Sequence, residues 1–336
     1  MSAASPVEYG DAIRQAFEYL LGRYPQVFAI GQGLWSPWYV GNSMTDLDKK
    51  FGQARVIDTP VSELACTGAA IGASLCGYRP IVIHPRMDFM VLAADQIINQ
   101  AAKWSHMTGG QAHPGVTIRG IINRGGEQGA QHSQALHSWF AHIPGLRVVM
   151  PATAADARDL LIASVLCDDP VLYIDDRWLY ERAQVLGPVI ERPLAGEKPA
   201  VRRSGADVTL TGCGYSAFLC EQAAEQLGGL GIAAEVIDIR ILNPLDTTVI
   251  AESVGKTGRL CVVDGGWRTA GFAAEIIASV VEVVPHMRAR PVRITLPQAP
   301  APTSKPLEAA YYPSVATVVA AVIAMLERRS SAAPRQ

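Results

Sequence analysis

DTPVSELACTGAAIGASLCGYRP, residues 58–80, joins two short apolar runs that read as β-strands, RVID (55–58) and PIVIH (80–84). Between them, Glu63 begins a stretch made almost entirely of Ala, Gly, Cys, Ser and Leu, which is typical of a helix. Small residues on every face of such a helix let neighbouring backbones approach closely. A buried strand, a helix and a second buried strand in this order predict a parallel sheet.

The same alternation continues on both sides of this segment. Further strands are predicted at 27–30, 116–122, 147–150 and 170–175, and further helices at 12–21, 92–107, 133–141 and 154–167. Continuously apolar strands alternating with helices indicate a largely parallel sheet covered on both faces.

A second alternation follows a stretch rich in Gly and Pro at residues 186–200, which we interpret as a linker. Strands are predicted at 208–212, 233–239, 259–264 and 291–296, with helices at 216–227, after Pro244, at 271–283 and at 315–326. The sequence therefore predicts an α/β protein with two doubly wound domains, 1–185 and 201–336, and 336 residues suit two domains.

The composition restricts the partners and the compartment. A net charge of -2, from 29 basic and 31 acidic residues without long runs, favours neither nucleic acid nor a membrane surface. The six cysteines form no CxxC pair and are expected to be buried free thiols in a reducing compartment. The amino terminus does not resemble a signal peptide, and 315–326 is too short to span a bilayer. We expect a soluble, cytoplasmic protein with a disordered tail, SSAAPRQ (330–336).

Two residues stand out as candidates for chemistry. Glu63 would lie at a helix amino terminus in a dry junction, where its pKa can be tuned; alternatively it only complements the helix dipole. His132, in Gln131-His132-Ser133 after a Gly-rich loop, would lie at the start of the helix 133–141 and could transfer protons near neutral pH. Metal binding by the histidines here is not expected, because a spacing of five residues scatters them around a helix.

Several motifs resemble the beta subunits of pyruvate and branched-chain 2-oxo acid dehydrogenases. The matching pieces are DTPVSE (58–63), DQIINQAAKW (95–104), GAQHSQ (129–134), IPGLRVVMP (143–151), VVDGGWRTAGFAAEI (262–276) and PLEAAYYPSV (306–315). The resemblance covers nearly the whole chain in the same order. It implies a pyrimidine-binding domain followed by a domain like the carboxyl-terminal domain of transketolase.

What the resemblance implies about the site is specific. In this family the beta subunit holds the aminopyrimidine end of thiamine diphosphate, and an alpha subunit holds the diphosphate and Mg²⁺. Glu63 matches the glutamate that hydrogen-bonds the pyrimidine nitrogen, Phe89 the aromatic ring stacked on the pyrimidine, and His132 the histidine that handles protons around the covalent intermediate. The resemblance further implies two alpha and two beta subunits, with a lipoyl acyltransferase as a possible further partner. This chain lacks the family's Gly-Asp-Gly metal motif, so a partner is needed to hold the diphosphate.

The chain departs from the family at two places. Gln32 stands where the dehydrogenases carry an acid beneath the cofactor, and Arg86 stands where they carry a neutral residue. Arg86 could clamp an anionic substrate group, with Gln131 as a second candidate substrate contact, or could pair with Asp88 or Glu127. A specialised carboligase or transketolase-like enzyme is therefore an alternative to a dehydrogenase.

Two other interpretations compete. Gly212–Ala217 reads G-x-G-x-x-A after a strand and is followed by Asp238, the outline of a dinucleotide-binding fingerprint, which would make the chain an NAD-binding oxidoreductase. The second competing interpretation is a non-catalytic scaffold that retains the fold. Retention of Glu63, Phe89 and His132 together argues against a scaffold.

Overall fold

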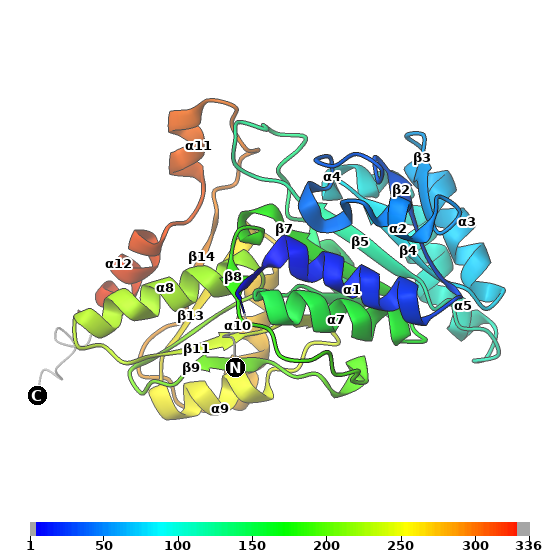
Figure 1. Cartoon of the computed structure of the whole chain (residues 1–336). Coiled ribbons are helices and arrows are strands. Elements are labelled where there is room, and N and C mark those ends of the chain that lie inside the picture. Colours follow the sequence, from blue (N-terminus) through cyan, green and yellow to red (C-terminus); the bar gives the residue numbers. More distant parts are fainter. Residues whose placement is uncertain (1–4, 328–336) are drawn as a thin grey trace, which may run out of the picture. The chain divides into compact units, whose positions relative to one another are not determined.

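The computed structural model describes residues 5–327, so the predicted tail 330–336 lies outside the described residues. The chain forms two compact units, Met1–Glu197 with Leu242–Pro244, and Lys198–Ile241 with Leu245–Gln336. Both units are α/β, which confirms the predicted fold class (Figure 1). The predicted linker 186–200 contains one short turn, η5 (Leu194–Gly196), and runs into strand β9; its role as the boundary stays a prediction.

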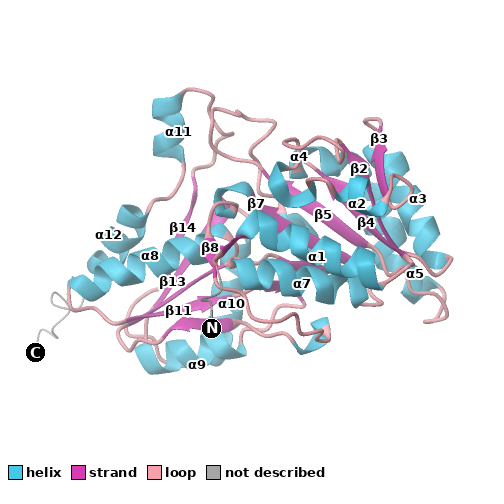
Figure 2. Ribbon diagram, in the orientation of Figure 1, coloured by secondary structure: helices cyan, strands magenta, loops and turns pink. Residues whose placement is uncertain are grey.

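The first unit is built on a seven-stranded sheet with the order β12-β6-β7-β5-β4-β2-β3 (Figure 2). The strands are β2 (Val27–Gln32), β3 (Val56–Thr59), β4 (Arg79–His84), β5 (Thr117–Ile122), β6 (Arg147–Val149), β7 (Val171–Asp176) and β12 (Ile241–Asn243). Pairing is parallel from β3 through to β6, as the continuous apolar runs predict. β12 was not predicted, and it comes from beyond residue 240, late in the chain.

Seven α-helices of the first unit connect and cover these strands. They are α1 (Tyr9–Arg23), α2 (Leu47–Phe51), α3 (Glu63–Leu75), α4 (Met87–Met90), α5 (Ala102–Met107), α6 (His137–Ala141) and α7 (Ala154–Leu166). Shorter turns are η1 (Gly41–Met44), η2 (Val91–Ala93) and η4 (Arg177–Leu179), and β1 (Val7–Glu8) pairs with β8 (Ala183–Gln184). α1 packs along α7, and α3 packs on β4 (Figure 1). The predicted helix 92–107 is helical, but its middle, η3 (Gln96–Ala101), is a π-helix.

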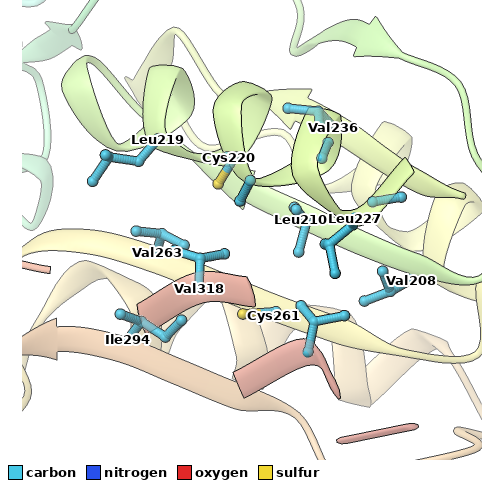
Figure 3. Close-up of a cluster of buried hydrophobic side chains, with 14 of the residues drawn as sticks. Val208, Leu210, Leu219, Cys220, Leu227, Val236, Cys261, Val263, Ile294 and Val318 are labelled. Carbon is cyan, nitrogen blue, oxygen red and sulfur yellow. The ribbon is translucent and has the colours of Figure 1, made fainter. Parts of the chain in front are cut away.

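The second unit has a five-stranded sheet with the order β14-β13-β10-β11-β9. Its elements are β9 (Ala200–Arg203), β10 (Val208–Gly212), α8 (Tyr215–Gly229), β11 (Ala234–Asp238), α9 (Thr248–Thr257), β13 (Leu260–Trp267), α10 (Phe272–Val283), β14 (Val292–Leu296), α11 (Lys305–Tyr311) and α12 (Val315–Glu327). Only β9 among the paired strands runs antiparallel to its neighbour within the described part of this sheet. Figure 3 shows the core between the sheet, α8 and α12.

The most apolar segment near the carboxyl terminus forms helices α11 and α12. By length and composition the segment Lys305–Glu327 could cross a membrane. The structure divides it, because α11 ends at Tyr311 and α12 begins at Val315. A helix of 13 residues is roughly 20 Å long, short of the roughly 30 Å of a bilayer core. One face of α12 buries Val318 in the core of Figure 3, together with Val322 and Met325, which confirms the predicted packed helix.

The cysteine prediction is partly wrong. All six cysteines are free, and Cys213, Cys220 and Cys261 are buried as expected. Cys76, however, is exposed. It is the C-cap residue of α3, where the chain leaves the helix at the surface, so the apolar stretch before it does not cover its thiol.

The glycines of the G-x-G-x-x-A segment serve packing and a tight turn. A Cβ atom on Gly212 would lie 2.8 Å from the carbonyl oxygen of Val263, so only glycine lets β10 approach β13 here. Gly214 precedes α8 with a φ of 51°. Asp238, the expected ribose ligand of such a fingerprint, accepts a hydrogen bond from Arg202 Nη2 at 2.7 Å. The segment therefore gives no support to NAD binding.

Candidate functional site

A narrow cleft opens where three parallel strands of the first unit end. Its lining comes from the carboxyl ends of β2, β3 and β4 and from the first turn of α3: Gly31, Gln32, Thr59, Pro60, Ser62, Glu63, Cys66, Val82, Ile83, His84 and Pro85. The carboxyl ends of parallel strands are the usual place for a ligand in such sheets. Gly31 allows this close approach of β2 and β4, because a Cβ atom there would lie 2.4 Å from the carbonyl oxygen of Ile83.

Glu63 is the first residue of α3, as predicted, and lines this cleft. Its side chain is half-buried, and within residues 5–327 its carboxylate makes no hydrogen bond or ion pair. Ser62, the N-cap residue, leaves the helix end without a side-chain cap and instead donates its hydroxyl to the carbonyl of Val61. The carboxylate therefore remains available to a ligand, in the positive field of the helix amino terminus.

Gln32, which stands where the resemblance predicts an acid, is the last residue of β2 and lines the cleft. Its amide Nε2 donates to the hydroxyl of Tyr39 at 2.7 Å. The neutral amide of Gln32 therefore brings no charge to this partly buried position.

Phe89, on helix α4, and His132, in the loop before α6, come together. Phe89 belongs to α4 and is 38% exposed, whereas its neighbours Met87 and Met90 are fully buried. Phe89 is therefore not an ordinary core aromatic. The rings of Phe89 and His132 meet edge to face, with centroids 5.3 Å apart. The structure thus offers an exposed aromatic ring with an imidazole at its edge.

The predicted helix 133–141 is wrong in its first turn, since α6 begins only at His137. His132 therefore lies in a loop rather than at a helix start. The loop is held by Asp88, whose Oδ1 accepts the backbone N–H of Gln134 at 3.1 Å and its side-chain amide at 2.9 Å.

Asp88 itself was not predicted as part of the site. It is 7% exposed, and its Oδ2 is buried without a hydrogen bond. Burial raises the pKa of the Asp88 carboxyl, and the hydrogen bonds from Gln134 oppose that rise in pKa. A single aspartate before an aromatic residue resembles a surface turn in the sequence, so no local pattern identifies it.

Arg86 is the N-cap residue of α4, directly after the cleft residues His84 and Pro85. It forms no ion pair with either of its expected alternatives, Asp88 or Glu127, within the described chain. Its Nη1 is buried and has no hydrogen-bond partner.

Gln131, the second candidate substrate contact, lies in the exposed loop beside His132. No side-chain hydrogen bond of Gln131 fixes its position in the part of the chain that the structure covers. Its amide remains available to a ligand.

His84 also lines the cleft, although the sequence suggested only a strand end. It is 2% exposed, and burial lowers the pKa of its imidazole to about 4. Its Nε2 lies 3.2 Å from Thr67 Oγ1 on α3. His84 therefore contributes a neutral hydrogen-bonding ring between β4 and α3.

A charged network joins the interior of β5 to the carboxyl end of β7 and the segments that follow these strands. Arg119 is fully buried and binds both carboxylate oxygens of Asp175, at 2.8 and 2.9 Å. Arg124 pairs with Asp176. Arg177 donates through Nη2 to the carbonyl of Tyr39. None of these residues was predicted to belong to the site.

The described residues contain no group of three or more His, Cys, Asp or Glu side chains that could hold a metal ion. His137 is buried, whereas His142 is exposed, so the histidines of this region do not converge.

Comparison with known proteins finds a family match for each of the two units. The family pattern described as "Transketolase, pyrimidine binding domain" matches residues 5–182, and that described as "Transketolase, C-terminal domain" matches residues 197–318. The beta subunit of acetoin:2,6-dichlorophenolindophenol oxidoreductase of Cupriavidus necator is 39% identical, covering 92% of this chain and 94% of its own. The mitochondrial pyruvate dehydrogenase E1 beta subunit of Caenorhabditis elegans is 37% identical, covering 95% of this chain and 92% of its own.

A solved structure shares the fold. It is a split-gene transketolase, described as an inactive β4 tetramer, with a TM-score of 0.78 and 22% identity, and the match covers 96% of this chain and 99% of that one.

Proposed function

The chain belongs to the transketolase-like family that includes the beta subunits of pyruvate dehydrogenase E1, and from this membership we propose its function. It is the beta subunit of a thiamine-diphosphate-dependent enzyme that cleaves a 2-oxo acid or a ketol and transfers the acyl or ketol fragment. The observation that carries the proposal is the Glu63 carboxylate, which lines the cleft without a partner in the described chain.

The residues fit the pyrimidine end of the cofactor. When bound, thiamine diphosphate supplies the carbon nucleophile and the electron sink. Glu63 would hold a proton on the pyrimidine ring nitrogen, and the exposed ring of Phe89 would stack on the pyrimidine. His132, held at the edge of Phe89, would move a proton or stabilise charge near the reacting carbon.

The diphosphate and Mg²⁺ belong to a partner in this proposal. The chain has no Gly-Asp-Gly motif anywhere in its sequence, so an alpha subunit that carries the motif supplies the metal site. We propose two alpha and two beta subunits. A lipoyl acyltransferase would join them if the acyl group passes to a lipoyl arm.

A carboligase or another enzyme acting on a ketol is the second candidate. It is favoured by the relative named for acetoin, which is 39% identical. Gln32 in place of the family acid and Arg86 beside the cleft also fit an altered substrate, with Gln131 as a further contact. We propose the cytoplasm as the location, because six free cysteines suit a reducing compartment.

The substitution Glu63→Gln tests the proposal. It should leave assembly with the alpha partner intact and slow hydrogen–deuterium exchange at the thiazolium C2 of the bound cofactor. A slowing of roughly 10²–10⁴-fold is expected, the usual contribution of a positioned acid–base group. Glu18→Gln, on the outer surface of α1, is the matched control and should exchange at the wild-type rate. Exchange at the wild-type rate in Glu63→Gln would remove this residue from the mechanism.

A further inference from the structure

Two arginines at the carboxyl edge of the first sheet have unsatisfied donors. Arg86 follows β4, and Arg177 follows β7. Arg86 Nη1 and Arg177 Nε are both buried and have no hydrogen-bond partner in the structure. Buried donors of a guanidinium group without an acceptor are costly, and their presence at an edge that binds ligands points to an absent acceptor.

The other arginines of this edge are neutralised. Arg119 is paired with Asp175, and Arg124 is paired with Asp176. Arg86 and Arg177 have no carboxylate within ion-pair distance among the described residues. Neither of these two guanidinium groups is therefore neutralised by a direct ion pair in the described chain.

Arg86 and Arg177 follow two strands, β4 and β7, that flank β5 in the sheet, so both lie at the same end of neighbouring strands. Burial lowers the pKa of Arg177 most, Tyr180 and Asp175 raise this pKa, and the positive charges of Arg119 and Arg86 lower it. Arg177 is also held in place, since its Nη2 donates to the carbonyl of Tyr39, and the Tyr39 hydroxyl accepts from Gln32 in the cleft. This chain of contacts connects Arg177 to the lining of the Glu63 cleft.

We propose that Arg86 and Arg177 together bind an oxyanion, a carboxylate or a phosphate, on the part of the substrate that is transferred. This inference rests on the proposed function. A carboxylate that leaves as CO₂ loses its charge in the transition state, so arginines bound to it would stabilise the ground state and slow the reaction. A pair of arginines therefore suits an anion that survives the reaction. The substrate class is a 2-oxo acid or ketol that carries a second acidic group.

The first test is binding of inorganic phosphate and of succinate to the full chain, measured by calorimetry at constant ionic strength. Arg86→Gln and Arg177→Gln should each weaken binding of the preferred anion at least tenfold, as expected for loss of a charge-assisted contact. Arg147→Gln is the matched control, because Arg147 is partly buried but lies at the amino end of β6. The preferred anion, phosphate or carboxylate, identifies the acidic group of the substrate.

Folding is controlled separately. Arg177→Lys keeps the charge if Arg177→Gln does not fold, and Arg86→Gln breaks no side-chain hydrogen bond of the structure. The inference would be overturned if the wild type bound neither anion, or if the wild type and Arg86→Gln bound the anion equally well. Because this measurement needs no cofactor, its failure leaves the proposed function untouched.

The second test uses the complex with the alpha partner. The preferred anion should inhibit turnover competitively with the donor substrate, and Arg86→Gln should raise its inhibition constant at least tenfold. Loss of anion binding on assembly, or inhibition that is not competitive, would assign the arginines to the subunit contact instead and overturn the inference. Absence of any turnover with thiamine diphosphate would count against the proposed function, whereas the binding measurement would still decide the anion site.

Discussion

His84 shows how burial determines the chemistry of a single residue. Its imidazole ends β4 inside the sheet edge, where burial lowers its pKa to about 4, and Thr67 on α3 is its hydrogen-bond partner. At neutral pH the ring is therefore neutral. A third positive charge beside the cleft, added to those of Arg86 and Arg177, is thereby avoided.

The depressed pKa of His84 predicts a pH dependence of stability. The unfolded imidazole has a pKa near 6.5 and the folded one a pKa of about 4, so the unfolded state binds more protons between these values. Stability from the neutral ring is present above pH 6.5 and is lost as pH falls to 4, by about 3 kcal/mol at most. Calorimetric melting between pH 7.5 and pH 4.5 measures it.

The variant His84→Gln keeps a hydrogen-bonding group for Thr67 and removes the titration. Its melting temperature should fall less on acidification than that of the wild type. His106→Gln, at an exposed position on α5, should follow the wild type. An equal acid loss in all three proteins would show that His84 does not control the transition.

The candidate residues differ in how far the sequence reveals them. Glu63 and His132 stood out from their places in the sequence, Phe89 was singled out only by the resemblance to a family, and the functional roles of all three stay predictions. Arg177 and His84 carry no local signal, because an arginine or histidine at a strand end is common in any α/β protein. Only the order of the strands in the sheet brings Arg177 and Arg86 to one edge.

Among the elements, the loop before α6 depends on one contact from α4. Asp88 Oδ1 accepts both the backbone N–H and the side-chain amide of Gln134, and this loop carries His132. Asp88→Ala should therefore release residues 129–136 and speed their amide hydrogen exchange. Losing hydrogen bonds to a charged acceptor of this kind costs roughly 1.5–3 kcal/mol.

The control for this prediction is Asp88→Asn, which retains a carbonyl oxygen for Gln134 and should leave the exchange of the loop slow. Hydrogen-exchange mass spectrometry of the two variants makes the comparison directly. Equal protection of 129–136 in Asp88→Ala and wild type would show that the loop is held by other contacts.

The elements differ in how well the sequence predicts them. The helix 63–76 was predicted within one residue of α3 (Glu63–Leu75). Every strand of the first sheet except β12 was predicted within two residues, because local apolar periodicity determines these elements. The first turn of the helix 133–141 was predicted and is absent. The loop in its place is bonded to Asp88, 46 residues earlier, and no local pattern encodes such a contact.

At the scale of the whole molecule, the missing metal motif predicts dependence on a partner. The purified chain should show no activity and bind thiamine diphosphate weakly, since it offers only the pyrimidine half of the site. Co-expression with an alpha subunit that carries the Gly-Asp-Gly motif should produce both properties, in a complex with two copies of each chain. Native mass spectrometry, with a beta chain of 35.9 kDa, gives the stoichiometry.

Tight, Mg²⁺-dependent binding of thiamine diphosphate by the chain alone would contradict this division of the site. A chain that assembles with the partner but leaves the complex unable to bind the cofactor would contradict it as well.

Strand β12 has a consequence for how the protein is made. It completes the outer edge of the seven-stranded sheet beside β6, but residues 241–243 are synthesised only after the first strands of the second unit. On the ribosome, β6 therefore waits with unpaired backbone groups, the condition under which sheet edges pair wrongly. A gene cut at Glu197 would yield a first half with this edge bare and a second half with a strand that has no sheet.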